Sequence, residues 1–254
     1  MIPYGTTMPT AQASFSDKPL RLVVSGSMVE RLKCRHQVLH TLIHACQASS
    51  QIEAHLIGDG PDRAACEKLV HQAGFADRIH FHGRVPPEQV QPLLQRSQAI
   101  LLMSEYEGLP VALLEAMAAG VVPVVRSIES GIPELVQHEH TGLLVGNDPA
   151  EAAAALVRLS REPDLWQRCS TQSRALVEAG YGADQCFERW LGVIEQQRVS
   201  ARPPFSIRTT DLRRLLPLPD PRFQSQYPPP PPRWSRLHPR RLLGRLRRMA
   251  GQLA

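Results

Sequence analysis

Short apolar runs alternate with amphipathic stretches along residues 20–197. The apolar runs predict buried strands at 20–25, 52–57, 79–81, 99–103, 121–125 and 141–145. The other stretches predict helices at 35–45, 62–73, 87–95, 111–119, 130–135, 150–161, 163–180 and 183–196. Strands that alternate with helices form parallel sheets with helices on both faces. We therefore predict an α/β fold built on a doubly wound parallel sheet.

Residues 99–120 contain two acids whose positions need explaining. Glu107 falls in the polar loop after a strand, and Glu115 falls within an apolar helix that Pro110 begins and Gly120 ends. A carboxylate on such a helix must be paired or must face a polar ligand. Ligands of open α/β sheets bind beyond the carboxyl ends of the strands. Both acids are therefore candidates for a hydroxyl-rich, phosphate-bearing ligand; the alternative is one acid at a surface edge and one in water.

The run from Glu107-Gly108-Leu109-Pro110 through Glu115 to Val124 resembles the E-x7-E signature of family 4 (group 1) retaining glycosyltransferases, which have the GT-B fold. The resemblance implies that Glu107 contacts the donor sugar and that Glu115 holds the nucleotide ribose. Residues 1–197 resemble the Rossmann-like, donor-binding C-terminal half of such an enzyme. Residues 2–6 resemble the segment that joins the two halves, so we expect the acceptor-binding half not to be encoded here.

The segment after the first predicted strand departs from the family pattern. Family members commonly carry Gly-Arg-Leu there, followed by a Lys, and the two cations grip the diphosphate. This chain has Gly26 and Ser27, with Lys33 in the lysine position. Ser27 donates one hydrogen bond without charge, so we expect weaker diphosphate binding unless Arg31 or Arg35 compensates. The alternative for Lys33 is a solvated lysine at a helix edge.

Two further turns complete the implied donor site. The turn at 83–85 resembles the loop beneath the nucleotide base, although Arg84 also fits a solvated turn. Ser130–Glu134 resembles a turn near the donor, but Glu134 equally suits the first turn of a helix. The expected binding residues are Gly26, Ser27, Lys33, Gly83, Arg84, Val85, Glu107, Gly108, Leu109, Pro110 and Glu115, with Glu107 and Lys33 as the catalytic ones.

Other classes of site fit the sequence less well. The turn at 58–61 lacks the third glycine of a nicotinamide motif, because Arg63 takes that place. Five cysteines without C-x-x-C spacing favour neither disulfides nor zinc. We expect His36, His40 and His44 to line a surface helix edge. Trp166, Phe187 and Trp190 are predicted as packing residues. We expect no metal and no cofactor other than the nucleotide sugar, which is the substrate.

The last part of the chain has a different composition. Residues 198–254 hold 13 Arg and two acids, a net charge of +11, so the remaining residues carry 5 − 11 = −6. The same segment contains 11 of the 23 prolines. We predict an interdomain lead-in at 1–19, a nucleotide-sugar-binding domain at 20–197 and a Pro/Arg-rich, flexible tail at 198–254. A basic amphipathic helix at 239–251 would suit an anionic membrane surface or a partner; specific nucleic-acid binding is not expected, and a solvated tail is the alternative.

Function follows from the resemblance. It implies transfer of a sugar, of the hexosyltransferase type, from a nucleoside diphosphate to an acceptor hydroxyl with retention, in polysaccharide biosynthesis. The alternatives are a donor-binding module that needs a separate acceptor-binding domain or subunit, and a membrane or scaffold adaptor on a degenerate domain. No apolar run is long enough to span a bilayer. We expect a cytoplasmic protein, with the tail as a means of peripheral contact with the inner face of the membrane.

Overall fold

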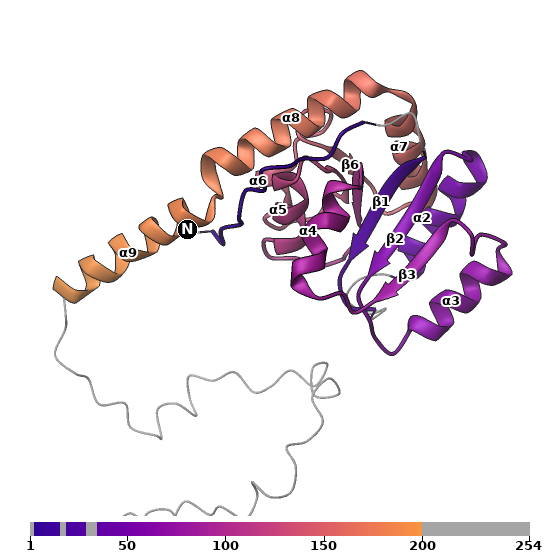
Figure 1. Cartoon of the computed structure of the whole chain (residues 1–254), viewed down its shortest axis with the longest axis horizontal. Coiled ribbons are helices and arrows are strands. Elements are labelled where there is room, and N and C mark those ends of the chain that lie inside the picture. Colours follow the sequence, from indigo (N-terminus) through magenta and orange to yellow (C-terminus); the bar gives the residue numbers. More distant parts are fainter. Residues whose placement is uncertain (1–2, 16–18, 29–34, 200–254) are drawn as a thin grey trace, which may run out of the picture. The chain divides into compact units, whose positions relative to one another are not determined.

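The structure, a computed structural model, describes residues 3–15, 19–28 and 35–199. Within them, six parallel strands form one sheet in the order β3-β2-β1-β4-β5-β6 (Figure 1). The strands are β1 (Leu20–Ser25), β2 (Ile52–Ile57), β3 (Ile79–Gly83), β4 (Ala99–Leu102), β5 (Val122–Arg126) and β6 (Leu143–Val145). This strand order defines the doubly wound nucleotide-binding fold. The prediction of a Rossmann-like α/β fold is confirmed.

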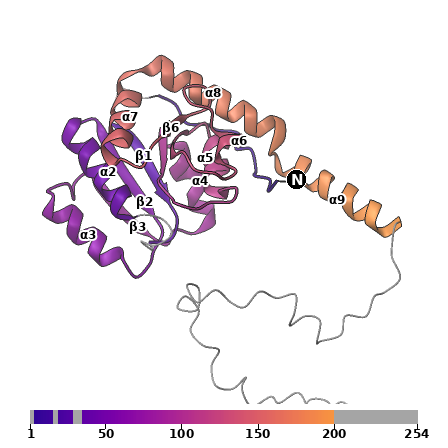
Figure 2. The ribbon, with the colours of Figure 1, turned by 180° about the vertical axis from the view of Figure 1, so that it is seen from behind.

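Helices cover both faces of the sheet, as short right-handed crossovers require. The described helices are α2 (Arg35–Ala48), α3 (Arg63–Gln72), α4 (Pro87–Gln95), α5 (Val111–Ala118), α6 (Ile132–Leu135), α7 (Pro149–Arg161), α8 (Pro163–Gly180) and α9 (Ala183–Val199). α2 packs against α3 and α7, whereas α5 packs against α4 and α8. Figure 2 shows this arrangement from behind. Most helix ends lie within three residues of the predicted ones.

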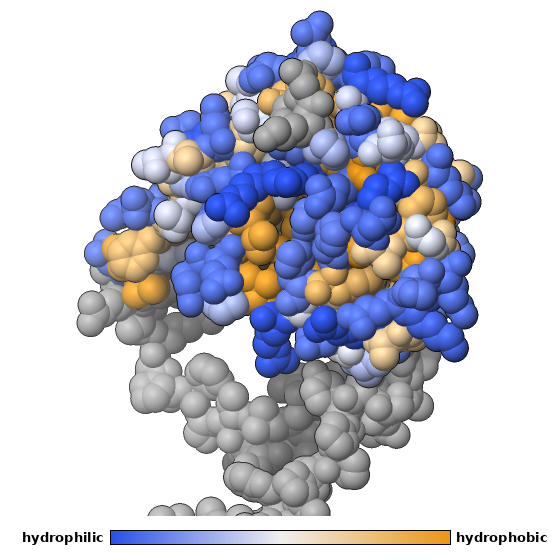
Figure 3. Space-filling view, turned by 45° about the vertical axis from the view of Figure 1, so that its right-hand side comes forward, coloured by the Kyte–Doolittle hydropathy of each residue, from blue (hydrophilic) through white to orange (hydrophobic). Residues whose placement is uncertain are grey.

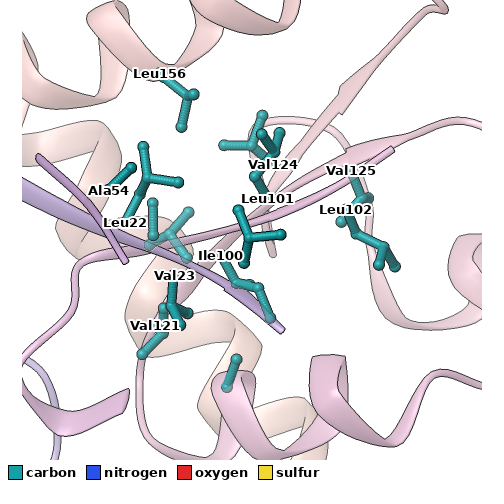
Figure 4. Close-up of a cluster of buried hydrophobic side chains, with 14 of the residues drawn as sticks. Leu22, Val23, Ala54, Ile100, Leu101, Leu102, Val121, Val124, Val125 and Leu156 are labelled. Carbon is teal, nitrogen blue, oxygen red and sulfur yellow. The ribbon is translucent and has the colours of Figure 1, made fainter. Parts of the chain in front are cut away.

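The central strands form the core, and their side chains point to both faces. Leu22 and Val124 meet Leu156 of α7 on one face, while Val23 and Val121 lie on the other (Figure 4). All four residues of β4 are buried. A strand buried on both faces needs a continuous apolar run, which explains why its sequence shows no alternation.

α5 is almost wholly buried, and its ends follow from two residues. Pro110, at φ −69° and ψ 114°, leads the chain into the first turn. Gly120 has φ +76°, which ends the helix after Ala118 at little cost. Within α5, the residues that are not fully buried are Val111, Ala112 and Glu115. Because these positions share one side of the helix, α5 has a single open edge in its first turns.

The turns after β1, β2 and β3 are bonded to one another. The Gly26 N–H donates to the Ile57 carbonyl (3.0 Å), and the Gly58 N–H donates to the Gly83 carbonyl (2.8 Å). The Met28 N–H donates to the Asp59 carbonyl (3.0 Å). Gly58 has φ +132°, and a Cβ there would lie 2.0 Å from the Gly26 carbonyl oxygen. These lateral bonds define the backbone at the carboxyl edge of the sheet.

The segment before β1 was expected to be extended, and the described part of it, residues 3–15, is bound along the domain. The Thr6 N–H donates to the Tyr181 carbonyl (2.8 Å), and the Ala13 N–H donates to the Ala119 carbonyl (2.7 Å). The Arg174 guanidinium donates to the carbonyls of Pro9 and Ala118. Backbone and side-chain bonds therefore hold this segment against α5, α8 and the start of α9.

Two aromatic side chains that were predicted to pack lie on the surface. Phe187 and Trp190 of α9 are 61% and 48% exposed, so the prediction that they pack within the domain is wrong; Trp166 is buried as expected. Figure 3 shows a face on which hydrophilic residues dominate and hydrophobic residues form separate patches. Among the helices in the described ranges, none combines the length and apolar character needed to cross a bilayer.

The turn at Gly58 gives a direct test of this architecture. We expect Gly58→Ala to lower the free energy of unfolding by about 3 kcal/mol or more, because the new Cβ adds a backbone clash to an unfavourable φ. Gly74→Ala is the matched control, since Gly74 has φ +78° and no atom within 4 Å of the added Cβ. It should cost only about 1–2 kcal/mol. The free energy of unfolding is measured in urea. An equal loss in the two variants would contradict the close contact between Gly58 and the Gly26 carbonyl.

Candidate functional site

The candidate residues meet at the carboxyl edge of the sheet. Gly26 and Ser27 follow β1. Gly83 is the last residue of β3, and Arg84 and Val85 come directly after it. Glu107 to Pro110 lie on the loop between β4 and α5. β1 and β4 are neighbours in the sheet although their crossovers run in opposite directions, so the gap between them is the topological switch point. Such gaps bind ligands in doubly wound sheets. The structure thus brings the described members of the predicted site to one edge.

Glu115 lies in the second turn of α5, on its open edge. The side chain is half-buried, between the buried residues Leu114 and Ala116. Burial raises the pKa of its carboxyl above the ordinary value of 4.5. Among the described residues, no hydrogen bond or ion pair reaches this carboxylate. A desolvated acid at the edge of an apolar helix matches the position expected of a ligand-binding group.

Glu107 lies on the loop that leads into α5. The side chain is half-buried, whereas Gly108 is exposed and Pro110 is buried. The Gly108 carbonyl accepts from the Gly131 N–H (2.8 Å), which joins this loop to the turn after β5. A Cβ on Gly131 would lie 2.8 Å from the Gly108 oxygen. The close neighbours of Gly131 are therefore Gly108 and Leu109.

The turn after β3 borders a hollow on the side of α4. Gly83 has φ +66°, and Arg63 Nη1 would lie 2.5 Å from a Cβ placed on it. Arg84 is exposed and Val85 is half-buried. A cavity of about 350 Å³ is lined by His82, Arg84, Val85, Pro86, Gln89, Pro92, Leu93 and Arg96. Space of this kind beside the turn suits a ring-sized group, as the base-loop resemblance implies.

Part of the predicted phosphate grip lies outside the described residues. Lys33, the second predicted catalytic residue, and Arg31 lie between residues 28 and 35, where the structure describes no residues. The helix expected at 239–251 also lies outside the described residues, after residue 199. Gly26 has φ +139° and Ser27 is exposed. α5 begins at this edge after Pro110, and the positive end of its helix dipole favours negative charge there.

Arg126, which ends β5, was not singled out from the sequence. Its side chain is 18% exposed, and Nη1 lies 3.9 Å from a Glu105 carboxylate oxygen. Within the described part of the chain, this buried Nη1 has no hydrogen-bond partner. The signal available in the sequence was a cation at the end of an otherwise apolar strand. The guanidinium adds positive charge beside the loop that carries Glu107.

The described side chains include no group of three or more His, Cys, Asp or Glu that could hold a metal ion. His36, His40 and His44 lie exposed along α2, as predicted. Cys46, Cys66, Cys169 and Cys186 are buried, and none of them forms a disulfide within the described residues. Burial raises the pKa of the Cys169 thiol to about 11, so it is protonated at neutral pH.

Comparison with known proteins identifies the family. The model for glycosyl transferases group 1 matches residues 11–176, about two-thirds of the chain. The chain belongs to this family. The group 1 match includes Gly26, the turns after β2 and β3, and both acids of the β4–α5 segment. Only the first residues of the lead-in and the end of the chain lie outside it.

Relatives and solved structures agree with this group 1 assignment. The amylovoran biosynthesis glycosyltransferase AmsK of Erwinia amylovora is 31% identical over 190 residues, which is 70% of this chain and 45% of AmsK. The C-terminal domain of the Francisella tularensis group 1 protein LpcC superposes with a TM-score of 0.61 at 19% identity, covering 70% of this chain and 99% of that one. S. aureus TarM in complex with UDP has a TM-score of 0.68 at 17% identity and covers 74% of this chain and 38% of TarM. The match thus spans less than half of AmsK.

Glu115 yields a prediction about stability. A raised pKa means that the folded state favours the neutral carboxyl, so this contribution is present below pH 4.5 and lost as pH rises through the raised value. Glu115→Gln is neutral throughout. We therefore expect it to be as stable as the original chain at pH 4 and more stable at pH 7, measured by urea unfolding. Glu188→Gln, at an exposed position on α9, should show no such difference; a loss at pH 7 would show that the Glu115 carboxylate is paired.

Proposed function

We propose that this chain binds a nucleoside diphosphate sugar at the carboxyl edge of its sheet and supplies the donor-binding half of a retaining glycosyltransferase. The observation that carries the proposal is the half-buried Glu115 carboxylate on the open edge of α5, eight residues after Glu107. A desolvated carboxylate with no hydrogen-bond partner among the described residues is suited to accept hydrogen bonds from ribose hydroxyls. Family membership and the UDP-containing TarM structure support the same donor class.

The proposed reaction transfers the sugar from the diphosphate to an acceptor hydroxyl. The bond between the anomeric carbon and the diphosphate oxygen breaks, with its electron pair left on that oxygen. The acceptor oxygen bonds to the same face of that carbon, and the acceptor's hydroxyl proton passes to the leaving diphosphate. Negative charge grows on the leaving diphosphate. Lys33, the N–H groups of Gly108 and Leu109, and the first turn of α5 would stabilise this charge. Glu107 would orient the sugar, and the mechanism assigns no role to a divalent metal.

An exposed apolar stripe on α9 bears on whether the chain acts alone. Phe187, Trp190, Val193 and Ile194 are 39–61% exposed and recur at helical spacing along one side. Tyr4, 67% exposed, lies on the segment that Thr6 joins to Gly182 at the start of α9. Figure 1 shows α9 continuing away from the sheet beside the start of the chain. We propose that this stripe contacts an acceptor-binding domain or subunit, which matches a chain that aligns with less than half of AmsK.

The two acids should have separable roles. Glu115→Gln is expected to weaken binding of the free nucleoside diphosphate by about tenfold, because it removes a charge-assisted hydrogen bond to ribose. Glu107→Gln should leave that affinity unchanged and reduce discrimination among nucleotide sugars. Calorimetry with UDP, GDP and their sugars measures both. Glu188→Gln serves as the control; unchanged affinity for every ligand in both variants would refute the assignment of this site.

The need for a partner can be tested with the same ligands. Positioning the acceptor against the donor supplies about 7–11 kcal/mol of barrier reduction in favourable cases. The isolated chain should therefore bind donor but transfer sugar very slowly, and adding an acceptor-binding polypeptide should raise the rate. Trp190→Ser should abolish this increase without changing nucleotide affinity, whereas Glu188→Ser should preserve it. Full turnover by the purified chain alone would exclude the module interpretation.

A further inference from the structure

Three histidines and one glutamate meet on the open face of the sheet. His55 Nδ1 lies 2.9 Å from His82 Nε2, and Glu53 Oε1 lies 3.1 Å from His80 Nε2 and 3.4 Å from His55 Nε2. Arg21 Nε bonds the other Glu53 oxygen at 3.3 Å. Leu22 pairs with Ala54, and Ala54 pairs with Ile79, so these three side chains point to one face of the sheet. The residues that precede or follow them in the sequence, which include Glu53, His55 and His80, point to the other face. Among the described helices, none lies in front of β2 and β3 on that face (Figure 1).

The arrangement is not that of a metal site. The His55 ring stacks on both His80 and His82, with centroids 5.2 and 5.1 Å apart and ring planes 29° apart in each case. Lone pairs in nearly parallel rings point side by side rather than toward one ion. The direct His55–His82 hydrogen bond instead requires one ring to donate an N–H and the other to accept it. This pair links β2 to the edge strand β3.

The pair is located where the two strands change register. The β2–β3 pairing shifts between Leu56 and Ile57, so that Ile57 pairs with Gly83. Immediately beyond the shift, the Gly58 N–H donates to the Gly83 carbonyl. Among the described strands, β3 has a neighbour on one side only. The His55–His82 bond therefore supports the last regular backbone contact before the turn at 83–85, and His82 lines the same cavity as Arg84 and Val85.

The groups around the pair disfavour added protons. Burial lowers the pKa of His55 to about 4; Glu53 opposes this shift, and His82, His80 and Arg21 add to it. Burial and then His80 lower the pKa of His82. Arg84 and Arg96 line the cavity with His82, and Arg63 lies against Gly83. The neutral pair can take up one added proton, which the two rings share in the hydrogen bond. A second added proton would make both rings cations, with ring nitrogens 2.9 Å apart.

We propose that His55 and His82 are positioning residues that hold the turn at Gly83, Arg84 and Val85 for the nucleotide, and that acid releases this turn. The inference rests on the proposed function, because the turn is assigned there to the nucleotide base. Since the folded pair favours its neutral form, the hold is complete above the ordinary histidine pKa of about 6.5 and is lost as pH falls toward 4. For His55 alone, lowering the pH from 8 to 5 favours the released turn by about 30-fold.

The first test needs neither a variant nor a ligand. Amide hydrogen exchange of the full chain reports the Gly58 N–H, whose acceptor is the Gly83 carbonyl. After correction for the intrinsic rate, its protection should fall by tenfold or more between pH 8 and pH 5. The Val122 N–H, bonded to the Gln98 carbonyl at 2.9 Å between β4 and β5, should keep its protection. Constant protection at Gly58, or equal losses at both amides, would overturn the proposal.

Matched variants separate the hydrogen bond from its titration. In His55→Asn/His82→Gln, side-chain amides replace the two ring nitrogens that meet, and they do not titrate in this range. The protection of Gly58 should then be independent of pH. His140→Gln, which alters an exposed histidine before β6, should behave as the original chain. If the double variant does not fold, His82→Gln alone should reduce the pH dependence of the Gly58 protection by at least threefold. An unreduced pH dependence would refute the proposed role of the His55–His82 pair.

Nucleotide binding then tests the link to the site. Calorimetry with UDP and GDP at pH 8 and pH 5 compares the original chain with the double variant, which corrects for titration of the terminal phosphate, whose pKa is about 6. We expect the original chain to lose at least threefold more affinity than the variant. Absence of binding at pH 8 refutes the proposed function, while hydrogen exchange still decides the role of the pair. Binding whose pH dependence is the same in both proteins overturns the link between the pair and the nucleotide.

Discussion

Burial of the β4–α5–β5 segment is the interaction on which the rest of the structure depends. Every residue of β4, and all of α5 except the edge at Val111, Ala112 and Glu115, is buried. Each fully buried Val, Leu, Ile or Met side chain contributes about 1.5–3 kcal/mol, so this segment supplies much of the favourable free energy of folding. The same packing defines where α5 begins. A helix terminus that favours anions is thereby held at the edge of the sheet rather than left on a mobile loop.

Strand order explains how residues distant in sequence come to one place. Because all six described strands are parallel, each turn that follows a strand lies at the same edge. Lateral bonds from Gly26 to Ile57 and from Gly58 to Gly83 fasten three of these turns, and the bond from Gly131 to Gly108 fastens two more. The edge therefore has a rigid backbone, on which the acidic side chains and the exposed turns are presented.

The sequence predicted the parallel sheet and the β4–α5 segment well, because apolar runs, Pro110 and Gly120 carry strong local signals. It was less informative where tertiary contacts decide. Trp190 is a large aromatic residue of a type that usually packs inside a domain, yet α9 extends away from the sheet and leaves this side chain exposed. The His55–His82 pair could not be found from spacing, since it depends on which strands are neighbours and on a shift of register between them. The roles of Glu107, Glu115 and Lys33 stay predictions, and Lys33 lies outside the described residues.

The bridge between Thr6 and Gly182 has a consequence for how such a domain is combined with others. The segments around these two residues lie side by side, with the Thr6 carbonyl accepting from the Ala183 N–H at 3.0 Å. A fold whose two ends are adjacent can be inserted into a host polypeptide without stretching either connection. Because Thr6 and Gly182 are adjacent, recombination at these two points would transfer residues 6–182 as one unit. The whole described sheet, with its carboxyl edge, would then pass from one protein to another.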